Sequence, residues 1–449
     1  TGRGFKMSGQ QIFFPAFSGI LFIALVHFAQ AATDWGTKGV ADTSKVKNIV
    51  QITDDSQTDQ LKMLSGRTWP QGTTAAVDPW SKDGQWIAFT ARFDVSDESH
   101  EEICKIKPDG TGFTRLTSNA LSDSNASFGS DGKIYFTHYT STIETPNYTY
   151  QVWRMNADGS LPPVYNLSAV HTATSSEEDP RISPDATKIA YNKNSLLYVA
   201  NSDGTLEHKV SGKRADTVTD INLTEGYYSW SPDSQYLAFT GYDGTGYWIY
   251  VVKSDGSNAN EVNISITKPP FILPNISHEW PQFSPDGTKI VYQWSEYTGS
   301  PDYFTNYNLR VIDVGGTNEK SLDSASSNPL FVWEELGGPF TWSPDSKYVA
   351  YRKHYNNVDN NVYYVYLFMV DTTQTTPTPL QLTTDYNDFI PVWSPDGSQI
   401  LFQSWGGNYS DYPSRENPAN GDTGDLLLIN LKTFPWPMFM PAVQSGSKK

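Results

Sequence analysis

Residues His278 to Trp294 read HEWPQFSPDGTKIVYQW, and the centre of this stretch decides the fold. In Ser-Pro-Asp-Gly the proline presets its backbone φ angle, and aspartate and glycine suit a tight turn, so the chain is predicted to reverse here. After the turn Ile290 and Tyr292 alternate with other side chains, which is typical of a β-strand. The stretch therefore predicts a β-hairpin.

Related hairpins recur along the chain about 50 residues apart, which is the range of propeller repeats. Each copy continues with a third strand and a second tight turn such as KPDGT or KSDGS, and most then end in a short outer strand such as RLT or QLT. Seven copies of this kind predict an all-β, seven-bladed β-propeller with four strands in each blade. The turn aspartates of the seven copies are Asp83, Asp131, Asp185, Asp233, Asp286, Asp345 and Asp396.

The two ends of the repeat region complement each other. Lys47 to Thr53, KNIVQIT, resembles an outer strand with no blade before it, and Asp425 to Leu431, DLLLINL, resembles a third strand with no outer strand after it. We therefore expect the N-terminal strand to complete the last blade and to close the ring, which removes exposed sheet edges. The expected propeller spans residues 47–433, after a lead-in at 32–46 and before a tail rich in proline and aromatic residues at 434–449.

The composition limits the function. A formal charge of −17 and a pI of about 4.8 argue against nucleic acid as a partner, since phosphates require a basic surface. Residues 1–31 combine basic residues, an apolar stretch and Ala-Gln-Ala, which predicts an export signal cleaved after Ala31. An uncleaved anchor is the alternative, and no other membrane span is expected. Cys104 is the single cysteine, so an internal disulfide is excluded.

The repeated WSPDG, the IAF-like strand and the DG…LT hairpin resemble the TolB-type propeller repeat over about residues 47 to 431. That repeat also occurs in oligogalacturonate lyases and in prolyl-oligopeptidase-like enzymes. The chain departs from each of them. Residues 32–46 are too few for the α/β domain of TolB, whose propeller has six blades, and no G-x-S-x-G motif is present. The lyases share the seven-blade count, but their metal site uses closely spaced histidines, and this chain has no H-x-H pair.

Propeller topology places the outer-to-inner loops and the second-to-third-strand loops on one face, which we call the long-loop face. Its predicted loops, at 92–101, 138–150, 293–308, 354–361 and 405–424, are long, and binding sites favour such loops on a rigid scaffold. Histidines and carboxylates gather there, either as a site or as polar groups that cap strand ends. The histidines are His100, His138, His171, His278 and His354, and the carboxylates are Asp78, Glu178, Asp179, Glu225, Glu279, Glu335 and Asp388.

We therefore expect an exported binding module whose long-loop face holds a protein or polysaccharide partner. The predicted ligand-binding residues are His278, Glu279, Asp388, Glu178, Tyr297 and Arg352, with His278 on the surface near the channel mouth. A divalent cation such as calcium is a possible cofactor, held by the carboxylates. One alternative is a polysaccharide lyase or hydrolase that uses His278 or Tyr297 as base and Arg352 or Arg181 to neutralise a uronate. The other is a structural protein of the cell surface.

Overall fold

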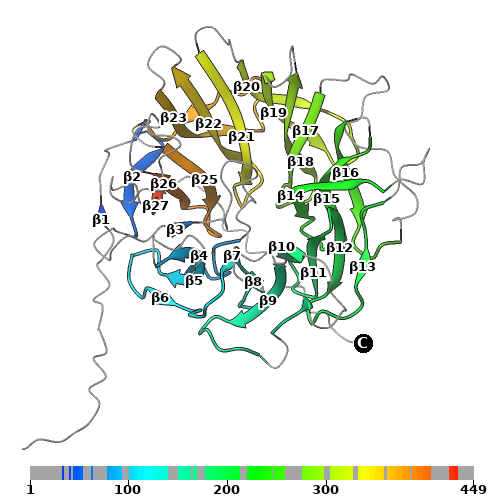
Figure 1. The fold of residues 1–449 in the computed structure, drawn as a ribbon. Coiled ribbons are helices and arrows are strands. Elements are labelled where there is room, and N and C mark those ends of the chain that lie inside the picture. The colour runs from blue at the N-terminus through cyan, green and yellow to red at the C-terminus, as the bar shows by residue number, and fades with distance from the viewer. Residues whose placement is uncertain are drawn as a thin grey trace, which may run out of the picture.

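The computed structural model describes residues 33–34, 40–41, 44–53, 62–63, 78–93, 101–139, 150–162, 165–168, 177–212, 220–244, 246–257, 276–297, 304–326, 332–357, 362–384, 387–405 and 424–432. Every helix or strand element assigned within these residues is a β-strand, and the strands are arranged as a ring around a common centre (Figure 1). The chain runs once around the ring, so its first strands lie beside its last ones.

The described strands form five hydrogen-bonded sheets, of which three are small. The first contains β3 (Lys62–Met63), β4 (Ile87–Arg92), β5 (Glu101–Ile106) and β6 (Thr114–Arg115). The second contains β7 (Asp123–Phe128), β8 (Lys133–Tyr139) and β9 (Tyr150–Asn156). The third contains β10 (Glu177–Ile182), β11 (Lys188–Lys193), β12 (Leu196–Asn201) and β13 (His208–Lys209).

Two larger sheets complete the ring, and each includes one parallel pairing held by a single residue pair, Tyr247 with Ser277 and Val365 with Asn387. The seven-stranded sheet contains β14 (Asn222–Trp230), β15 (Tyr236–Tyr242), β16 (Tyr247–Lys253), β17 (Ile276–Phe283), β18 (Lys289–Tyr297), β19 (Phe304–Asp313) and β20 (Lys320–Ser326). The nine-stranded sheet contains β1 (Thr33–Asp34), β2 (Val46–Gln51), β21 (Val332–Trp342), β22 (Tyr348–Asn357), β23 (Val362–Asp371), β24 (Leu380–Gln381), β25 (Asn387–Trp393), β26 (Gln399–Trp405) and β27 (Gly424–Leu431).

The Ser-Pro-Asp turn is fixed by one repeated set of hydrogen bonds. Between β17 and β18 the buried Ser284 hydroxyl donates to Asp286 Oδ1 at 2.6 Å and accepts the Lys289 N–H at 3.0 Å. Asp286 Oδ1 also accepts the Thr288 N–H at 3.0 Å, and Gly287 takes φ +71°. The motif therefore satisfies the backbone of the turn from its own side chains, which explains why its sequence recurs. The same serine-to-aspartate bond forms at Ser81, Ser183, Ser231, Ser343 and Ser394.

One copy of the turn is built differently. Between β7 and β8 a glycine, Gly129, takes the place of the serine, and a Cβ added there would lie 2.6 Å from Asp131 Oδ1 and 2.9 Å from Tyr135 Cε2. Asp131 is held instead by Lys133, whose ammonium lies 2.7 Å from Oδ2, and by the Tyr135 hydroxyl at 3.2 Å. This turn has one residue fewer before its second strand, and the glycine leaves the room that the shorter turn requires.

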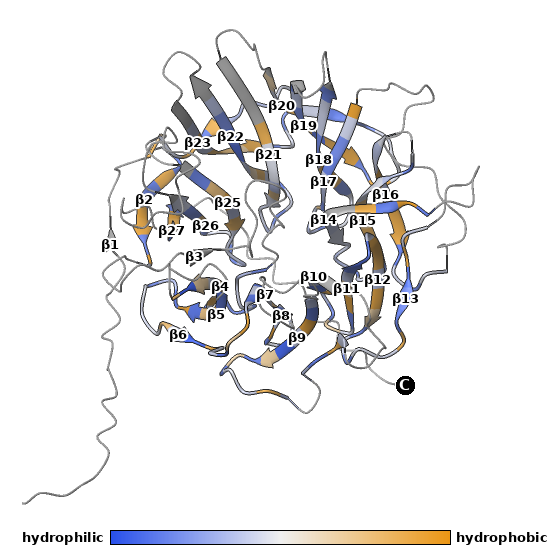
Figure 2. Ribbon diagram, in the orientation of Figure 1, coloured by the Kyte–Doolittle hydropathy of each residue, from blue (hydrophilic) through white to orange (hydrophobic). Residues whose placement is uncertain are grey.

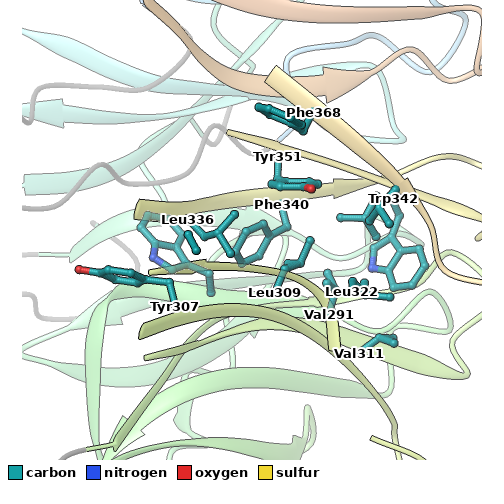
Figure 3. Close-up of a cluster of buried hydrophobic side chains, with 14 residues drawn as sticks. Val291, Tyr307, Leu309, Val311, Leu322, Leu336, Phe340, Trp342, Tyr351 and Phe368 are labelled. Carbon is teal, nitrogen blue, oxygen red and sulfur yellow. The ribbon is translucent and has the colours of Figure 1, made fainter. Parts of the chain in front are cut away.

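Buried apolar side chains join the sheets into one ring. Hydrophobic and hydrophilic segments alternate along the strands around it (Figure 2). In the described part of the chain these side chains form seven clusters. The largest packs Val291 and Leu309 of the seven-stranded sheet against Leu336, Phe340 and Tyr351 of the nine-stranded sheet (Figure 3). Such packing makes the ring a rigid support for the residues at its ends.

A further cluster brings the two ends of the repeat region together. Ile52, which follows β2, and Leu426 of β27 pack in the same cluster as Trp80 and Phe89. The strands β2 and β27 pair antiparallel along their length, and the Thr53 hydroxyl donates to Asp425 Oδ1 at 2.8 Å. The N-terminal strand is therefore bonded to the last strand of the ring.

The expectation of an all-β propeller is confirmed. Five sheets do not confirm the count of seven blades, because the two parallel pairings merge strands that the repeat assigns to separate blades. The seven-blade count and the closure of the ring by the N-terminal strand therefore stay predictions. The proposed leader at 1–31 and the tail at 434–449 lie outside the described residues. Among those residues the structure has no helix of the length and hydropathy that crossing a membrane requires.

Candidate functional site

The strands nearest the centre of the ring carry bulges that redirect side chains (Figure 1). In β7, β10, β17 and β25 the pairing with the next strand shifts register around one residue with positive φ. These residues are Asn125 at φ 57°, Asp179 at 56°, Trp280 at 59° and Ile390 at 53°. Bulges often re-aim side chains next to active sites, and asparagine and aspartate tolerate this conformation best. The bulges with Asn125 and Asp179 therefore favour a polar site.

Five polar side chains from neighbouring inner segments meet there, and we call Asp78, Asn125, Asp179, Arg181 and Tyr228 the inner polar cluster. The Asn125 amide donates to Asp179 Oδ1 at 3.3 Å. The Arg181 guanidinium donates to the Tyr228 carbonyl and lies 4.5 Å from the centre of the Tyr228 ring. The Tyr228 hydroxyl donates in turn to the Asp179 carbonyl. These bonds connect β7, β10 and β14.

The charges of the cluster sit in unlike environments. Arg181 is 5% exposed, and burial lowers its pKa against the opposing effect of Tyr228, Asp179 and Asp78. Asp78 is exposed to solvent, yet burial raises its pKa to about 6, with Arg181 acting in the opposite direction. A carboxyl with such a pKa exchanges protons near neutral pH, and the arginine beside it stabilises negative charge.

The inner polar cluster also has a plain structural use, because Arg181 ties β10 to β14 through a buried, partnered cation. Sequence reasoning named Asp78, Asp179 and Arg181 but missed Asn125 and Tyr228. A positional signal exists for the bulges. Asn125 and Asp179 each lie six residues before the aspartate of their own turn, as do the bulge residues of β17 and β25.

His278 of β17 lies inside the protein, so its expected place on the surface is wrong. It is 3% exposed, and its ring lies 5.3 Å from Trp248 and 5.4 Å from Tyr292, measured between ring centroids. Burial lowers its pKa to about 3, and the positive charge of Arg310 adds to this effect. Within the described residues its Nδ1 has no hydrogen-bond partner. Its ring packs against Trp248 of β16, a strand of the same sheet, and sequence alone does not reveal this contact.

Glu279 and Tyr297 are on the same hairpin as His278. Glu279 is partly buried and accepts the Ser277 hydroxyl at 2.6 Å. Tyr297 is the last residue of β18, opposite Phe304, and the position of its side chain lies outside what is described. Glu178 lies across from Asn192 in β10, again with no described side-chain position.

Arg352 of β22 lies against the ring of Phe389 in β25, directly after Asp388 in the sequence. The Arg352 guanidinium is 5.6 Å from the ring centre, and the His354 ring meets the same phenyl edge-on at 6.2 Å. Asp388 is 0% exposed and accepts the Ser404 hydroxyl at 2.7 Å. Burial, with help from Arg352, lowers the pKa of His354 to about 3. The described contacts place Arg352 beside Phe389, Asp388 beside Ser404, and His278 beside Trp248 and Tyr292.

A buried Asp–His pair escaped the sequence reasoning. The His138 ring nitrogen Nδ1 lies 2.6 Å from Asp123 Oδ1, and Asp123 also accepts the Asn119 amide at 2.8 Å. The His138 ring packs on Trp153 with ring centroids 4.0 Å apart. A carboxylate in this position fixes the tautomer of the imidazole. His138 was named only as one histidine of the long-loop face, because its aspartate is on another strand.

In the described part of the chain, no group of three or more His, Cys, Asp or Glu side chains is placed to hold a metal ion. The suggested calcium site on the ring of carboxylates stays an untested prediction.

Comparison with known proteins places the fold but no function. No protein-family model matches the chain. No curated protein matches it either. Among solved structures, an oligogalacturonate lyase in complex with manganese is 12% identical with a TM-score of 0.55, over 89% of this chain and 96% of that one. An oligogalacturonate lyase from Vibrio parahaemolyticus is 11% identical over the same shares, with a TM-score of 0.54.

A putative TolB from Agrobacterium tumefaciens is 17% identical over 56% of this chain and 80% of that one, with a TM-score of 0.36. The chain is a β-propeller. The expected resemblance to oligogalacturonate lyase propellers is confirmed, and at these identities it concerns the fold alone.

Proposed function

We propose that this chain is an exported binding module that holds a protein or glycan partner on its long-loop face and does not cleave it. The rigid ring would supply the support, and the ends of the strands on that face would supply the contacts. Export rests on the leader at 1–31, and N-terminal sequencing of the native protein should find a mature chain that begins near Ala32.

The burial of His278 carries the proposal. A general base must reach the proton that it removes, either directly or through one water. His278 is enclosed by Trp248 and Tyr292 and has its pKa held near 3, so it is a packing residue at neutral pH. His354 has the same low pKa and lies against Phe389. The lyase hypothesis thereby loses one of its two named bases, and Tyr297 remains the other.

The full chain is mixed with defined oligosaccharides, both neutral and uronate. A set of extracellular proteins is tested separately. Titration calorimetry measures binding, and ultraviolet absorbance records unsaturated uronate products. Saturable binding with flat absorbance supports the proposal. A sustained rise in absorbance with any uronate substrate would contradict it.

One observation favours the rival enzyme function. The inner polar cluster pairs the exposed Asp78, with its pKa raised to about 6, with the cation Arg181, and a lyase acting on uronates needs an acid or base beside such a cation. If the chain is a lyase, its rate should change with pH around 6, and Asp78→Asn should abolish that inflection. Arg181→Lys should raise KM for uronates more than for neutral sugars.

We further propose that the ring has seven blades over residues 47–433 and that β2 completes the last one. Three observations support this count. The two merged sheets are each joined by a single parallel residue pair, the buried apolar side chains of the described residues form seven clusters, and β2 pairs with β27. Cryo-electron microscopy or crystallography of the native protein would count the blades directly.

A further inference from the structure

A row of residues crosses the ends of four hydrogen-bonded strands, from β14 to β17. Asn222 lies opposite Tyr242, Tyr242 opposite Tyr247, and Tyr247 opposite Ser277. β14 begins at Asn222, β15 ends at Tyr242, and β16 begins at Tyr247. All four positions are therefore at the same end of the ring, the long-loop face, and we call them the tyrosine row.

The two tyrosines in the row are unusually exposed for large rings. Tyr242 is 40% exposed and Tyr247 is 38% exposed, and their ring centroids are 5.0 Å apart with planes tilted by 41°. Asn222, on the first strand, is also exposed. Each of the two adjacent rings offers the polarised C–H groups of a sugar an apolar face, while their hydroxyls and the amide offer hydrogen bonds.

The row rests on a firm base. Tyr247 is followed by Trp248, which is 0% exposed and packs against the buried His278 of β17. Gly241, next to Tyr242, is enclosed so closely that an added Cβ would lie 2.3 Å from Ile221. The backbone under the tyrosines is therefore fixed, which lowers the entropy lost when a ligand binds.

The charges beside the row select the class of ligand. Glu279, two residues beyond Ser277, accepts the Ser277 hydroxyl, and Asp243 directly follows Tyr242. The cation Arg310 is engaged elsewhere, since it lies 3.2 Å from Glu319 and 4.5 Å from the Trp294 ring centre. Asp243 is only 6% exposed and accepts the Tyr250 hydroxyl, so a uronate would be repelled mainly by Glu279, within a protein whose formal charge is −17. A neutral sugar avoids this repulsion, and its hydroxyl groups can donate to Glu279.

We propose that the tyrosine row is a carbohydrate-binding platform for neutral oligosaccharides, with sugar rings stacked on Tyr242 and Tyr247 and hydroxyls bonded to Glu279. This inference rests on the proposed function and specifies its partner. It also separates the site from the inner polar cluster, which contains Arg181 and would suit an anionic sugar.

The test uses the full chain and titration calorimetry with neutral cello- and manno-hexaose and, for comparison, hexagalacturonate. The double variant Tyr242→Ala/Tyr247→Ala should weaken neutral-sugar binding at least tenfold, and Tyr242→Phe/Tyr247→Phe should recover most of it because the rings remain. Tyr236→Ala is the matched control, since Tyr236 is 38% exposed at the opposite end of β15. It should bind as the unmodified protein does.

The outcomes distinguish the two proposals. Neutral-sugar binding that the double alanine variant retains would overturn the platform and leave the binding function intact. Binding of hexagalacturonate alone would overturn the assigned ligand class. Binding of proteins with no sugar bound would refute the platform while a binding module survives. If neither sugars nor proteins bind, both proposals fail. A circular dichroism spectrum identical to that of the unmodified protein shows that each variant is folded.

Discussion

Replacing Gly129 with the residue that the other copies of its turn contain should destabilise the protein. Six of the seven turns have serine at this position, and each of those hydroxyls donates to the turn aspartate. Restoring a repeat consensus usually stabilises a protein by roughly 0.5–2 kcal/mol. From the repeat alone, Gly129→Ser should therefore strengthen the turn between β7 and β8.

The structure gives the opposite sign. A Cβ at position 129 would lie 2.6 Å from Asp131 Oδ1 and 2.9 Å from Tyr135 Cε2, and Tyr135 is 0% exposed. Asp131 Oδ1 accepts the Lys133 N–H at 3.1 Å, so moving the carboxylate away loses that bond. Overpacking of this kind costs about 1–3 kcal/mol. The new hydroxyl offsets only part of the cost, since Asp131 already accepts bonds from Lys133 and Tyr135.

Urea unfolding of the full chain, followed by tryptophan fluorescence, measures the change. Gly129→Ala is the matched control, because it adds the Cβ without the hydroxyl, and it should destabilise at least as much as serine. Ser284→Gly tests the converse and should cost about 1 kcal/mol, since it removes the partner of a partly buried backbone N–H. A midpoint for Gly129→Ser above that of the unmodified protein would refute the argument from turn length.

Three further results are expected. Burial is the largest single effect on the pKa of Asp286, and it raises that pKa. The hydrogen bonds from Ser284 and Thr288 together outweigh burial, so the pKa of Asp286 is lowered overall. Its ionised form therefore stabilises the fold above the unfolded pKa, and this stability is lost as the pH falls through the folded pKa. Asp286→Asn should be less stable than the unmodified protein in urea at pH 7, with a difference that shrinks toward pH 3. His278→Ala should lower the free energy of unfolding by about 2–4 kcal/mol, because it leaves a cavity among aromatic rings. An unchanged melting temperature would contradict the buried position of His278. Deleting residues 47–53 should lower the melting temperature far more than deleting 33–44, because only the first exposes the edge of β27; equal losses would exclude a closing strand.

The fold was largely predictable because its signal is local. The turn motif carries its own hydrogen-bond partners within six residues, as Ser284 to Lys289 illustrate, so each copy identifies a hairpin without reference to the rest of the chain. The pairing of KNIVQIT with DLLLINL followed from the absence of partners at either end of the repeat. The merging of the sheets could not be predicted from the sequence, since the pairing of Tyr247 with Ser277 depends on how two neighbouring repeats pack against each other.

The candidate site was predictable only in part, because burial of a polar side chain depends on residues distant in sequence. His278 was expected just before an inner strand, whereas it lies within β17, and its enclosure comes from Trp248 on another strand. The partner of His138 is Asp123, fifteen residues earlier on a different strand. The tyrosine row was not predicted, since Tyr242 and Tyr247 belong to a short hairpin, whereas the sequence argument favoured long loops as binding sites.

The central claim is that the protein binds its partner without cleaving it, and saturation-transfer NMR of a neutral and a uronate hexasaccharide with the full chain tests both halves together. We predict transfer of saturation from the protein to the neutral sugar and unchanged sugar spectra after prolonged incubation. New olefinic or reducing-end signals from either sugar would show an enzyme and contradict the account.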